Sequence, residues 1–221
     1  MVILAAACTI TAMKEGSSNA HKVKYVALGD SYTIGEGVKH GEAFPDLLAK
    51  HLNLEGIDIV LSANPSVTGW TTKDLIENEI PVFDQIKPDF VTLLIGVNDW
   101  VQGVDSSTFH KNLNYILDHI QSLLPDKSKV LLITIPDFGV TPTGNRYSEG
   151  RDISKGITDF NNIIKAEARV RNLLVADIFP ETQKMKDSPD LIAHDGLHPS
   201  AKEYALWEKI IYPVTCKLLK N

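Results

Sequence analysis

Short runs of consecutive apolar residues alternate along this chain with longer stretches in which apolar residues recur every three or four positions. The short runs are typical of strands that are buried on both faces of a parallel sheet. The longer stretches have the spacing of amphipathic helices. The predicted strands are residues 23–28, 57–61, 90–95, 130–135 and 173–176. The predicted helices are residues 43–52, 72–80, 106–124, 153–169 and 199–219.

Strand and helix alternate five times, and no internal repeat or interior linker interrupts the alternation. This order predicts one α/β domain over residues 22–221, with right-handed crossovers between parallel strands. We expect a three-layer α/β/α arrangement of the flavodoxin-like type, with a five-stranded parallel sheet. A chain of 221 residues is long enough to bury a substantial core.

Polar turns follow the first three predicted strands. Ser31 comes directly after the first strand, a loop that contains Gly69 comes after the second, and Asn98 comes after the third. Because ligands bind at the carboxyl ends of parallel strands, we expect these three positions to gather along one edge of the sheet. The histidine-bearing loop at 193–199, ahead of the last helix, can reach the same edge. The sequence therefore predicts a functional site there.

Composition narrows the range of partners. The net charge of −6 and the absence of any Lys/Arg run argue against a nucleic-acid partner and against binding to an anionic membrane surface. The two cysteines, Cys8 and Cys216, provide no disulfide framework. No run of about 18 apolar residues occurs, so the sequence predicts no membrane-spanning helix.

The N-terminal extension, residues 1–21, has a composition of its own. Leu4-Ala5-Ala6-Ala7-Cys8 resembles the cleavage site of a bacterial lipoprotein signal, in which Cys8 would become the lipidated first residue. The basic and apolar parts of such a signal are curtailed here. Residues 14–20 are small and polar, as in a flexible tether. We interpret the extension as the remnant of a lipoprotein signal plus tether, and expect export to the cell envelope or medium. The alternative is a frayed extension of a cytoplasmic protein.

Four blocks of residues stand in a fixed order after the predicted strands. They are Gly29-Asp30-Ser31, the loop around Gly69, Gly96-x-Asn98-Asp99 and Asp195-x-x-His198. Their order and placement resemble the SGNH/GDSL hydrolase family over nearly the whole chain from Lys22 onward. The second block departs from the family pattern, because Ser66 and Thr68 replace its first glycine and its serine, but Gly69 is kept.

The resemblance implies a role for each matched residue. Ser31 would be the nucleophile, which needs an adjacent base because a free serine hydroxyl is a poor nucleophile. His198 would be that base, and Asp195 would orient its imidazole. The backbone N–H groups of Ser31 and Gly69, together with the Asn98 side-chain amide, would form the oxyanion hole. No metal or cofactor is expected.

Several residues next to these blocks have both a functional and a structural interpretation. Trp70 and Trp100 directly follow Gly69 and Asn98-Asp99, so we expect them to wall the substrate pocket, with core packing as the alternative. Asp30 and Asp99 are expected to accept backbone hydrogen bonds beside the catalytic positions. The segment 137–150 is rich in proline, glycine and polar residues, and we interpret it as the rim of the pocket, with a tolerated surface loop as the alternative.

The predicted function is a serine esterase or lipase that hydrolyses a small acyl ester through an acyl-enzyme. A short-chain esterase or lysophospholipase-like activity is the default, and a thioesterase or carbohydrate deacetylase would use the same chemistry. The alternative from another class is a non-catalytic, flavodoxin-like domain that binds a small ligand. Phosphoester hydrolysis usually requires a metal cluster or several cationic side chains, and neither is visible near these motifs. A zinc site at His194 and His198 is disfavoured because Gly196 and Pro199 interrupt any helix there.

Overall fold

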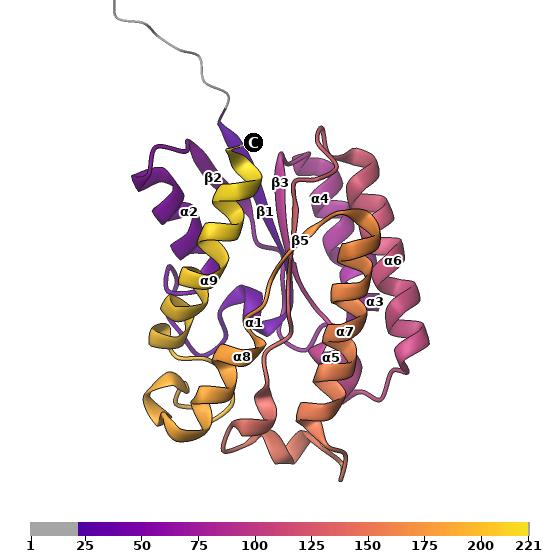
Figure 1. Ribbon diagram of the computed structural model, residues 1–221, viewed down its shortest axis with the longest axis vertical. Coiled ribbons are helices and arrows are strands. Elements are labelled where there is room, and N and C mark those ends of the chain that lie inside the picture. The colour runs from indigo at the N-terminus through magenta and orange to yellow at the C-terminus, as the bar shows by residue number, and fades with distance from the viewer. Residues whose placement is uncertain (1–21, 221) are drawn as a thin grey trace, which may run out of the picture.

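The structure is a computed structural model that describes residues 22–220, and its centre is a parallel sheet of five strands (Figure 1). The strands stand in the order β2-β1-β3-β4-β5, and every neighbouring pair is parallel. They are β1 (Val23–Gly29), β2 (Ile59–Ala63), β3 (Phe90–Leu94), β4 (Val130–Ile133) and β5 (Leu174–Ala176). The predicted five-stranded parallel sheet is confirmed.

The proposed lipid-anchored Cys8 lies outside the described residues.

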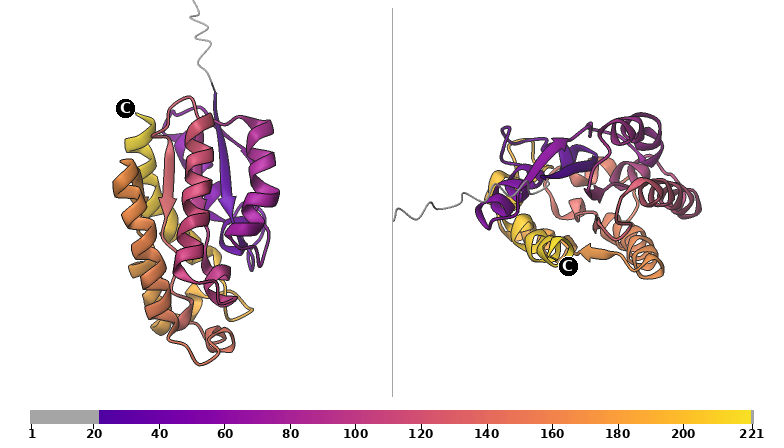
Figure 2. Two further views of the ribbon diagram at one scale, coloured as in Figure 1. Left: turned by 90° about the vertical axis from the view of Figure 1, so that its right-hand side faces the viewer. Right: turned by 90° about the horizontal axis from the view of Figure 1, so that it is seen from above.

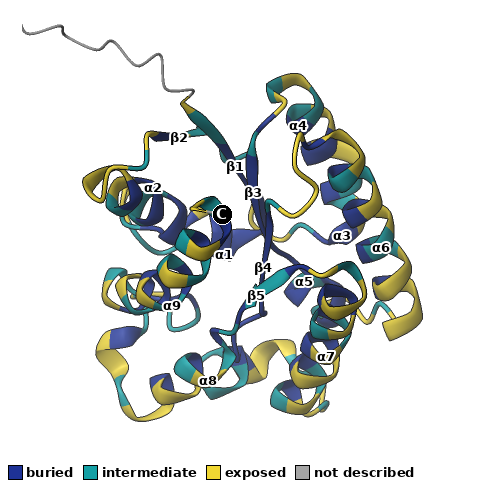
Figure 3. Ribbon diagram, turned by 45° about the horizontal axis from the view of Figure 1, so that its top comes forward, coloured by how far each residue is buried: buried dark blue, intermediate teal, exposed yellow. Residues whose placement is uncertain are grey.

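Helices cover both faces of the sheet, which gives the predicted three layers (Figure 3). One face carries α2 (Phe44–Leu54) and α9 (Ala201–Leu219), which pack against each other. The opposite face carries α3 (Thr72–Asp74), η1 (Leu75–Glu79), α4 (Ile80–Ile86), α6 (Ser106–Leu123) and α7 (Ile153–Arg171). None of the helices within residues 22–220 is long and apolar enough to cross a membrane.

Short helical elements gather at the carboxyl end of the strands (Figures 1 and 2). They are α1 (Ser31–Ile34), α5 (Val97–Val101), η2 (Phe138–Val140), η3 (Gly144–Tyr147), α8 (Phe179–Thr182), η4 (Gln183–Asp187) and η5 (Pro189–Leu191). These elements are too short to be stable by themselves and depend on packing against the sheet. They carry Ser31, Asn98 and Asp99, three of the polar residues that the sequence singled out.

The continuous apolar runs form strands because both faces of the sheet are covered. Every residue of β3 and β4 is buried, as a parallel sheet between helices requires. Two buried polar side chains inside the sheet meet each other's hydrogen-bonding needs, because the Tyr25 hydroxyl and Thr92 Oγ1 form a hydrogen bond of 2.7 Å. The rigid sheet then fixes where each strand ends, and so where each functional turn begins.

The structure corrects two predicted boundaries. The helix predicted to stop before Pro81 continues to Ile86, because Pro81 lies in the first turn of α4, where its missing N–H is not needed. A π-helical turn, η1, joins α3 to α4. The second strand begins at Ile59 rather than residue 57, since the N–H of Ile57 instead binds the carbonyl of Leu52 at 2.9 Å.

The packing of α7 against α5 gives a testable constraint. A Cβ added to Gly156 would lie 1.8 Å from Nε1 of Trp100, whose side chain is buried against this helix. Replacing glycine by alanine within a helix normally stabilises by about 0.5–1 kcal/mol. We predict that Gly156→Ala instead destabilises the protein by about 1–3 kcal/mol, because Trp100 must move.

Equilibrium denaturation in urea measures this free energy of unfolding. Asn162→Ala, on the exposed side of the same helix, is the control and should leave the stability unchanged or raised. A Gly156→Ala variant as stable as the Asn162→Ala variant would contradict the close packing of Trp100 on α7.

Candidate active site

Ser31 lies at a sharp turn where β1 passes into α1. The strand comes so close to β3 that a Cβ on Gly29 would lie 2.3 Å from the Leu94 carbonyl oxygen, so only glycine fits there. Asp30 caps the short helix, because its Oδ1 accepts a hydrogen bond from the Tyr32 N–H at 3.1 Å. Ser31 is therefore the first helical residue, held on a fixed backbone and 5% exposed.

Asp195 and His198 form a local pair in the loop ahead of α9. The carboxylate Oδ2 lies 2.6 Å from Nδ1 of His198, while Oδ1 accepts the backbone N–H groups of Leu197 (2.8 Å) and His198 (3.0 Å). Gly196 between them has a φ of 74°, which glycine adopts without strain. One carboxylate thus shapes its own turn and orients the imidazole.

Electrostatics keep the Asp195 carboxylate ionised. Partial burial raises its pKa, but the hydrogen bonds from His198 and from the backbone N–H groups outweigh burial and hold the pKa below its ordinary value. Because the folded-state pKa is lowered, the pair stabilises the fold above the ordinary carboxyl pKa. That contribution is lost as the pH falls through the lowered value.

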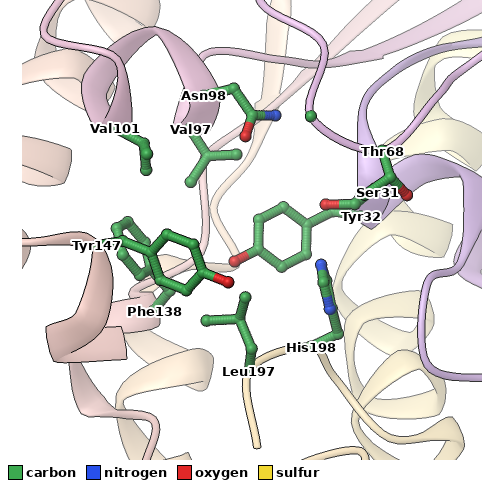
Figure 4. A pocket seen from close by; sticks show the side chains of 11 residues that line it. Ser31, Tyr32, Thr68, Val97, Asn98, Val101, Phe138, Tyr147, Leu197 and His198 are labelled. Atoms are coloured by element: carbon green, nitrogen blue, oxygen red, sulfur yellow. The ribbon is translucent and has the colours of Figure 1, made fainter. Parts of the chain in front are cut away.

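The other imidazole nitrogen of His198 turns toward the Ser31 side chain (Figure 4). Since Nδ1 is held by Asp195, the nitrogen that faces the serine is Nε2. The ring packs edge-on against Tyr32, with centroids 5.6 Å apart, which restricts its rotation. Within residues 22–220 no hydrogen bond engages the Ser31 hydroxyl. Serine–histidine contacts of this kind often tighten only when substrate binds.

Asn98 and Asp99 tie the start of α5 to the Gly69 loop. Asn98 Nδ2 donates to the carbonyl of Trp70 at 2.9 Å, and Asp99 Oδ2 accepts the N–H of Thr72 at 2.8 Å. Asp99 also accepts the Thr72 hydroxyl. The prediction that Asp30 and Asp99 accept backbone hydrogen bonds is confirmed. Two segments that are far apart in the sequence are thereby fixed to each other beside Ser31.

A cavity of about 170 Å³ lies where these segments meet (Figure 4). Four of the predicted site residues line it, namely Ser31, Gly69, Asn98 and His198. Asp195 lies behind His198 and does not line it. The rest of the lining is mostly apolar and consists of Tyr32, Thr68, Val97, Val101, Phe138, Tyr147 and Leu197.

Neither tryptophan that we expected in the pocket wall lines this cavity. Trp100 points away from it and is buried against Phe138, with ring centroids 5.8 Å apart, and under the guanidinium of Arg151. Two residues along a helix differ by about 200°, so Trp100 and Asn98 face opposite sides of α5. Trp70 contributes only its carbonyl, as the acceptor for Asn98.

The aromatic wall comes instead from Tyr32, Phe138 and Tyr147. Tyr32 directly follows Ser31, and the other two come from the segment 137–150 that we interpreted as the rim. This segment is fastened to the His198 loop, because the Thr143 N–H and hydroxyl both donate to the Gly196 carbonyl, at 3.0 and 2.9 Å. The sequence indicated this segment through its composition and its place after a strand, but did not single out its aromatic residues.

His194 does not join His198 in a metal site. His194 is exposed, and the loop that carries both residues is not helical. Among the described residues, no three histidine, cysteine, aspartate or glutamate side chains are grouped so that they could hold a metal ion.

A serine at the end of the first strand, an aspartate–histidine pair before the last helix and an asparagine after the third strand surround one cavity on a flavodoxin-like sheet. Such a combination is typical of hydrolases, on this fold as on others. The chain belongs to the GDSL-like lipase/acylhydrolase family, whose pattern matches residues 27–206. The family prediction from the sequence is confirmed, and so is the assignment to the GDSL-type ester hydrolases.

Named relatives are similar to this chain at moderate identity. A multidomain esterase of Ruminococcus flavefaciens is 36% identical over 121 residues, which are 53% of this chain and 14% of that protein. The chain thus spans only a small part of this relative. An arylesterase of Vibrio mimicus is 29% identical over 180 residues, 80% of each chain. The crystal structure of a lipase/acylhydrolase from Enterococcus faecalis has a TM-score of 0.70 and 25% identity, over 86% of this chain and 94% of that one.

The Asp99–Thr72 contact predicts a specific loss of activity. We expect Asp99→Ala to lower kcat for an aryl acetate about tenfold to a hundredfold, because the Gly69 loop loses its anchor to α5 and shifts beside Ser31. The variant's stability is measured in parallel, since Asp99 is buried.

Asp105→Ala is the matched control, because Asp105 caps α6 through similar hydrogen bonds to Ser107 and Thr108. It should cost about 1 kcal/mol of stability and leave kcat unchanged. A folded Asp99→Ala enzyme with the kcat of the Asp105→Ala enzyme would show that Asp99 does not position the loop.

Proposed function

We propose that this protein hydrolyses short-chain carboxylic esters, with Ser31 as the nucleophile and an acyl-enzyme as the intermediate. The observation that supports the proposal most strongly is the arrangement around the cavity. The Ser31 hydroxyl faces the free nitrogen of an imidazole whose other nitrogen is held by Asp195. A serine that lies opposite an oriented base is the arrangement that nucleophilic catalysis requires.

In the first step, the Ser31 oxygen attacks the ester carbonyl carbon and its proton passes to Nε2 of His198. The carbonyl electron pair moves onto the oxygen, and the resulting imidazolium is stabilised by the Asp195 carboxylate. The hydrogen bonds that lower the pKa of Asp195 favour this charge distribution. His198 then protonates the departing alcohol, and the acyl group remains on Ser31.

The tetrahedral oxygen would be bound by three N–H donors. Ser31 is the first helical residue, so its N–H has no acceptor within the helix. Gly69 offers a second backbone N–H in a loop with a φ of 87°, with no atom within 4 Å of where a Cβ would stand. An amide group has two hydrogens, and Asn98 donates one of them to Trp70, which leaves the second for the oxyanion.

Deacylation repeats these roles with water. His198 accepts a proton from a water molecule that attacks the acyl carbon, and the same three donors bind the second tetrahedral oxygen. Collapse of this intermediate breaks the bond to Ser31, returns the proton to the serine and releases the carboxylic acid.

The size and lining of the cavity favour a short, uncharged acyl group. A cavity of 150 Å³ holds a benzene molecule, so about 170 Å³ accommodates an acyl group of roughly six carbons or fewer. Its lining includes no lysine or arginine, which disfavours acyl groups that carry a carboxylate. A short acyl group fits this space better than the long chain of a lysophospholipid. Acetyl thioesters and sugar acetates carry the same acyl group and remain the nearest alternatives.

A panel of p-nitrophenyl esters and matched thioesters of increasing chain length tests this proposal. We expect kcat/KM to be highest for two to four carbons and to fall at least about tenfold by eight carbons, because the longer chain exceeds the cavity. The leaving-group half of the panel separates esterase from thioesterase activity.

Ser31→Ala is the control for the panel. It should keep the same far-ultraviolet circular dichroism and lose ester hydrolysis to the level of the buffer. A flat dependence on chain length would contradict the proposed acyl pocket. Turnover by Ser31→Ala comparable with that of the unmodified enzyme would contradict the mechanism, and no turnover by either would favour the ligand-binding alternative.

A further inference from the structure

Two buried carboxyl groups lie directly beneath the turn that carries Ser31. Asp30 and Glu79 are both fully buried, one at the start of α1 and the other at the end of the π-helical turn η1. Glu79 Oε2 accepts the N–H of Gly29 at 3.0 Å, and Asp30 Oδ1 accepts the N–H of Tyr32 at 3.1 Å. The two carboxyls therefore hold the backbone on either side of Ser31.

Each carboxyl has a second oxygen that is buried and unpartnered. Asp30 Oδ2 and Glu79 Oε1 have no hydrogen-bond partner in the described part of the chain. No ion pair within residues 22–220 engages either carboxyl. A buried carboxylate without a counter-ion is strongly disfavoured, so burial of these two groups favours their protonated forms.

Within the proposed function, which assigns the nucleophile to Ser31, these contacts indicate a positioning role. We propose that Glu79 is protonated in the folded protein and is a positioning residue that holds the Gly29–Ser31 turn in place. The bound proton removes the buried negative charge, while Oε2 still accepts the Gly29 N–H. The π-helical turn that delivers Glu79 is a feature that often marks functional sites.

The surrounding charges favour a protonated pair. Burial and, to a smaller extent, the Asp99 carboxylate raise the pKa of Asp30 to about 8. The hydrogen bond from the Tyr32 N–H lowers this pKa but does not outweigh burial. Burial, with a contribution from Asp30, also raises the pKa of Glu79 well above its ordinary value. The other titratable groups that interact electrostatically with Asp30 are Tyr32 and Tyr204. Both are acids as well, so neither supplies a positive charge. The described neighbourhood thus supplies no cation to compensate two charges.

The sign of the pH dependence follows from the raised values. Between the ordinary carboxyl pKa and about 8, the folded protein holds more protons at this pair than the unfolded chain does. The pair's contribution to stability is therefore fully present below the ordinary pKa and is lost as the pH rises toward 8.

The experiment compares Glu79→Gln and Glu79→Ala with Glu77→Gln and Glu77→Ala. Glu77 lies on the same turn but is exposed and forms an ion pair with Lys73 at the surface, so its variants are matched controls. Tm is measured from pH 5 to pH 8, and kcat and KM are measured with p-nitrophenyl acetate. Other buried carboxyls titrate alike in all variants, so they cancel in the differences.

We expect Glu79→Gln to gain at least about 3 °C in Tm relative to Glu77→Gln between pH 5 and pH 8, because the amide is neutral at every pH and removes the cost of keeping a buried carboxyl protonated. Its kcat should stay within about twofold of the unmodified enzyme, since the amide oxygen still accepts the Gly29 N–H. Glu79→Ala should lose kcat about tenfold or more with KM within about twofold.

Parallel Tm–pH curves for Glu79→Gln and Glu77→Gln would overturn the protonation of Glu79. Equal kcat values for Glu79→Ala and Glu79→Gln would overturn the positioning role. The Tm measurements need no substrate, so they decide the protonation of Glu79 even if Ser31 proved not to be the nucleophile. A failure of the proposed function would appear instead as an absence of turnover by the unmodified enzyme.

Discussion

The close approach of β1 to β3 is the constraint on which the site depends. Gly29 lies against the Leu94 carbonyl, where any side chain would collide, so only glycine fits at the last position of β1, where the chain turns into α1. The turn ends β1 at the edge of the sheet and starts α1 at Ser31. Because the sheet is buried on both faces and rigid, the serine is held at one position relative to the other strand ends. The other residues of the site are held in fixed positions relative to this turn.

The partners are connected to one another by hydrogen bonds as well as by the sheet. Asn98 and Asp99 fasten α5 to the segment around Trp70 and Thr72. Thr143 fastens the aromatic rim to Gly196, in the loop that carries Asp195 and His198. The cavity is therefore closed by contacts between loops that belong to different strands. This arrangement combines a site built on loops with the geometric precision that catalysis needs.

The sequence was sufficient to predict the sheet, its layers and the residues that meet at its edge, because continuous apolar runs and the polar turns after them follow directly from parallel-sheet geometry. It was not sufficient to predict which side chains face the cavity. Trp100 was misplaced because its direction depends on the rotation of α5, which sequence proximity to Asn98 does not determine. Glu79 was not recognised because a π-helical turn delivers it to the buried side, and Pro81 suggested that the helix ended there.

In the proposed mechanism, Ser31 is the activated serine of the chain, and its activation comes from His198. Peptide mass spectrometry after treatment with a fluorophosphonate measures this directly, because the reagent bonds covalently to an activated serine. We expect one adduct per chain, located on Ser31, and labelling that is slowed at least about a hundredfold in a folded His198→Ala variant. An adduct on another serine, or equally fast labelling of Ser31 without His198, would contradict it.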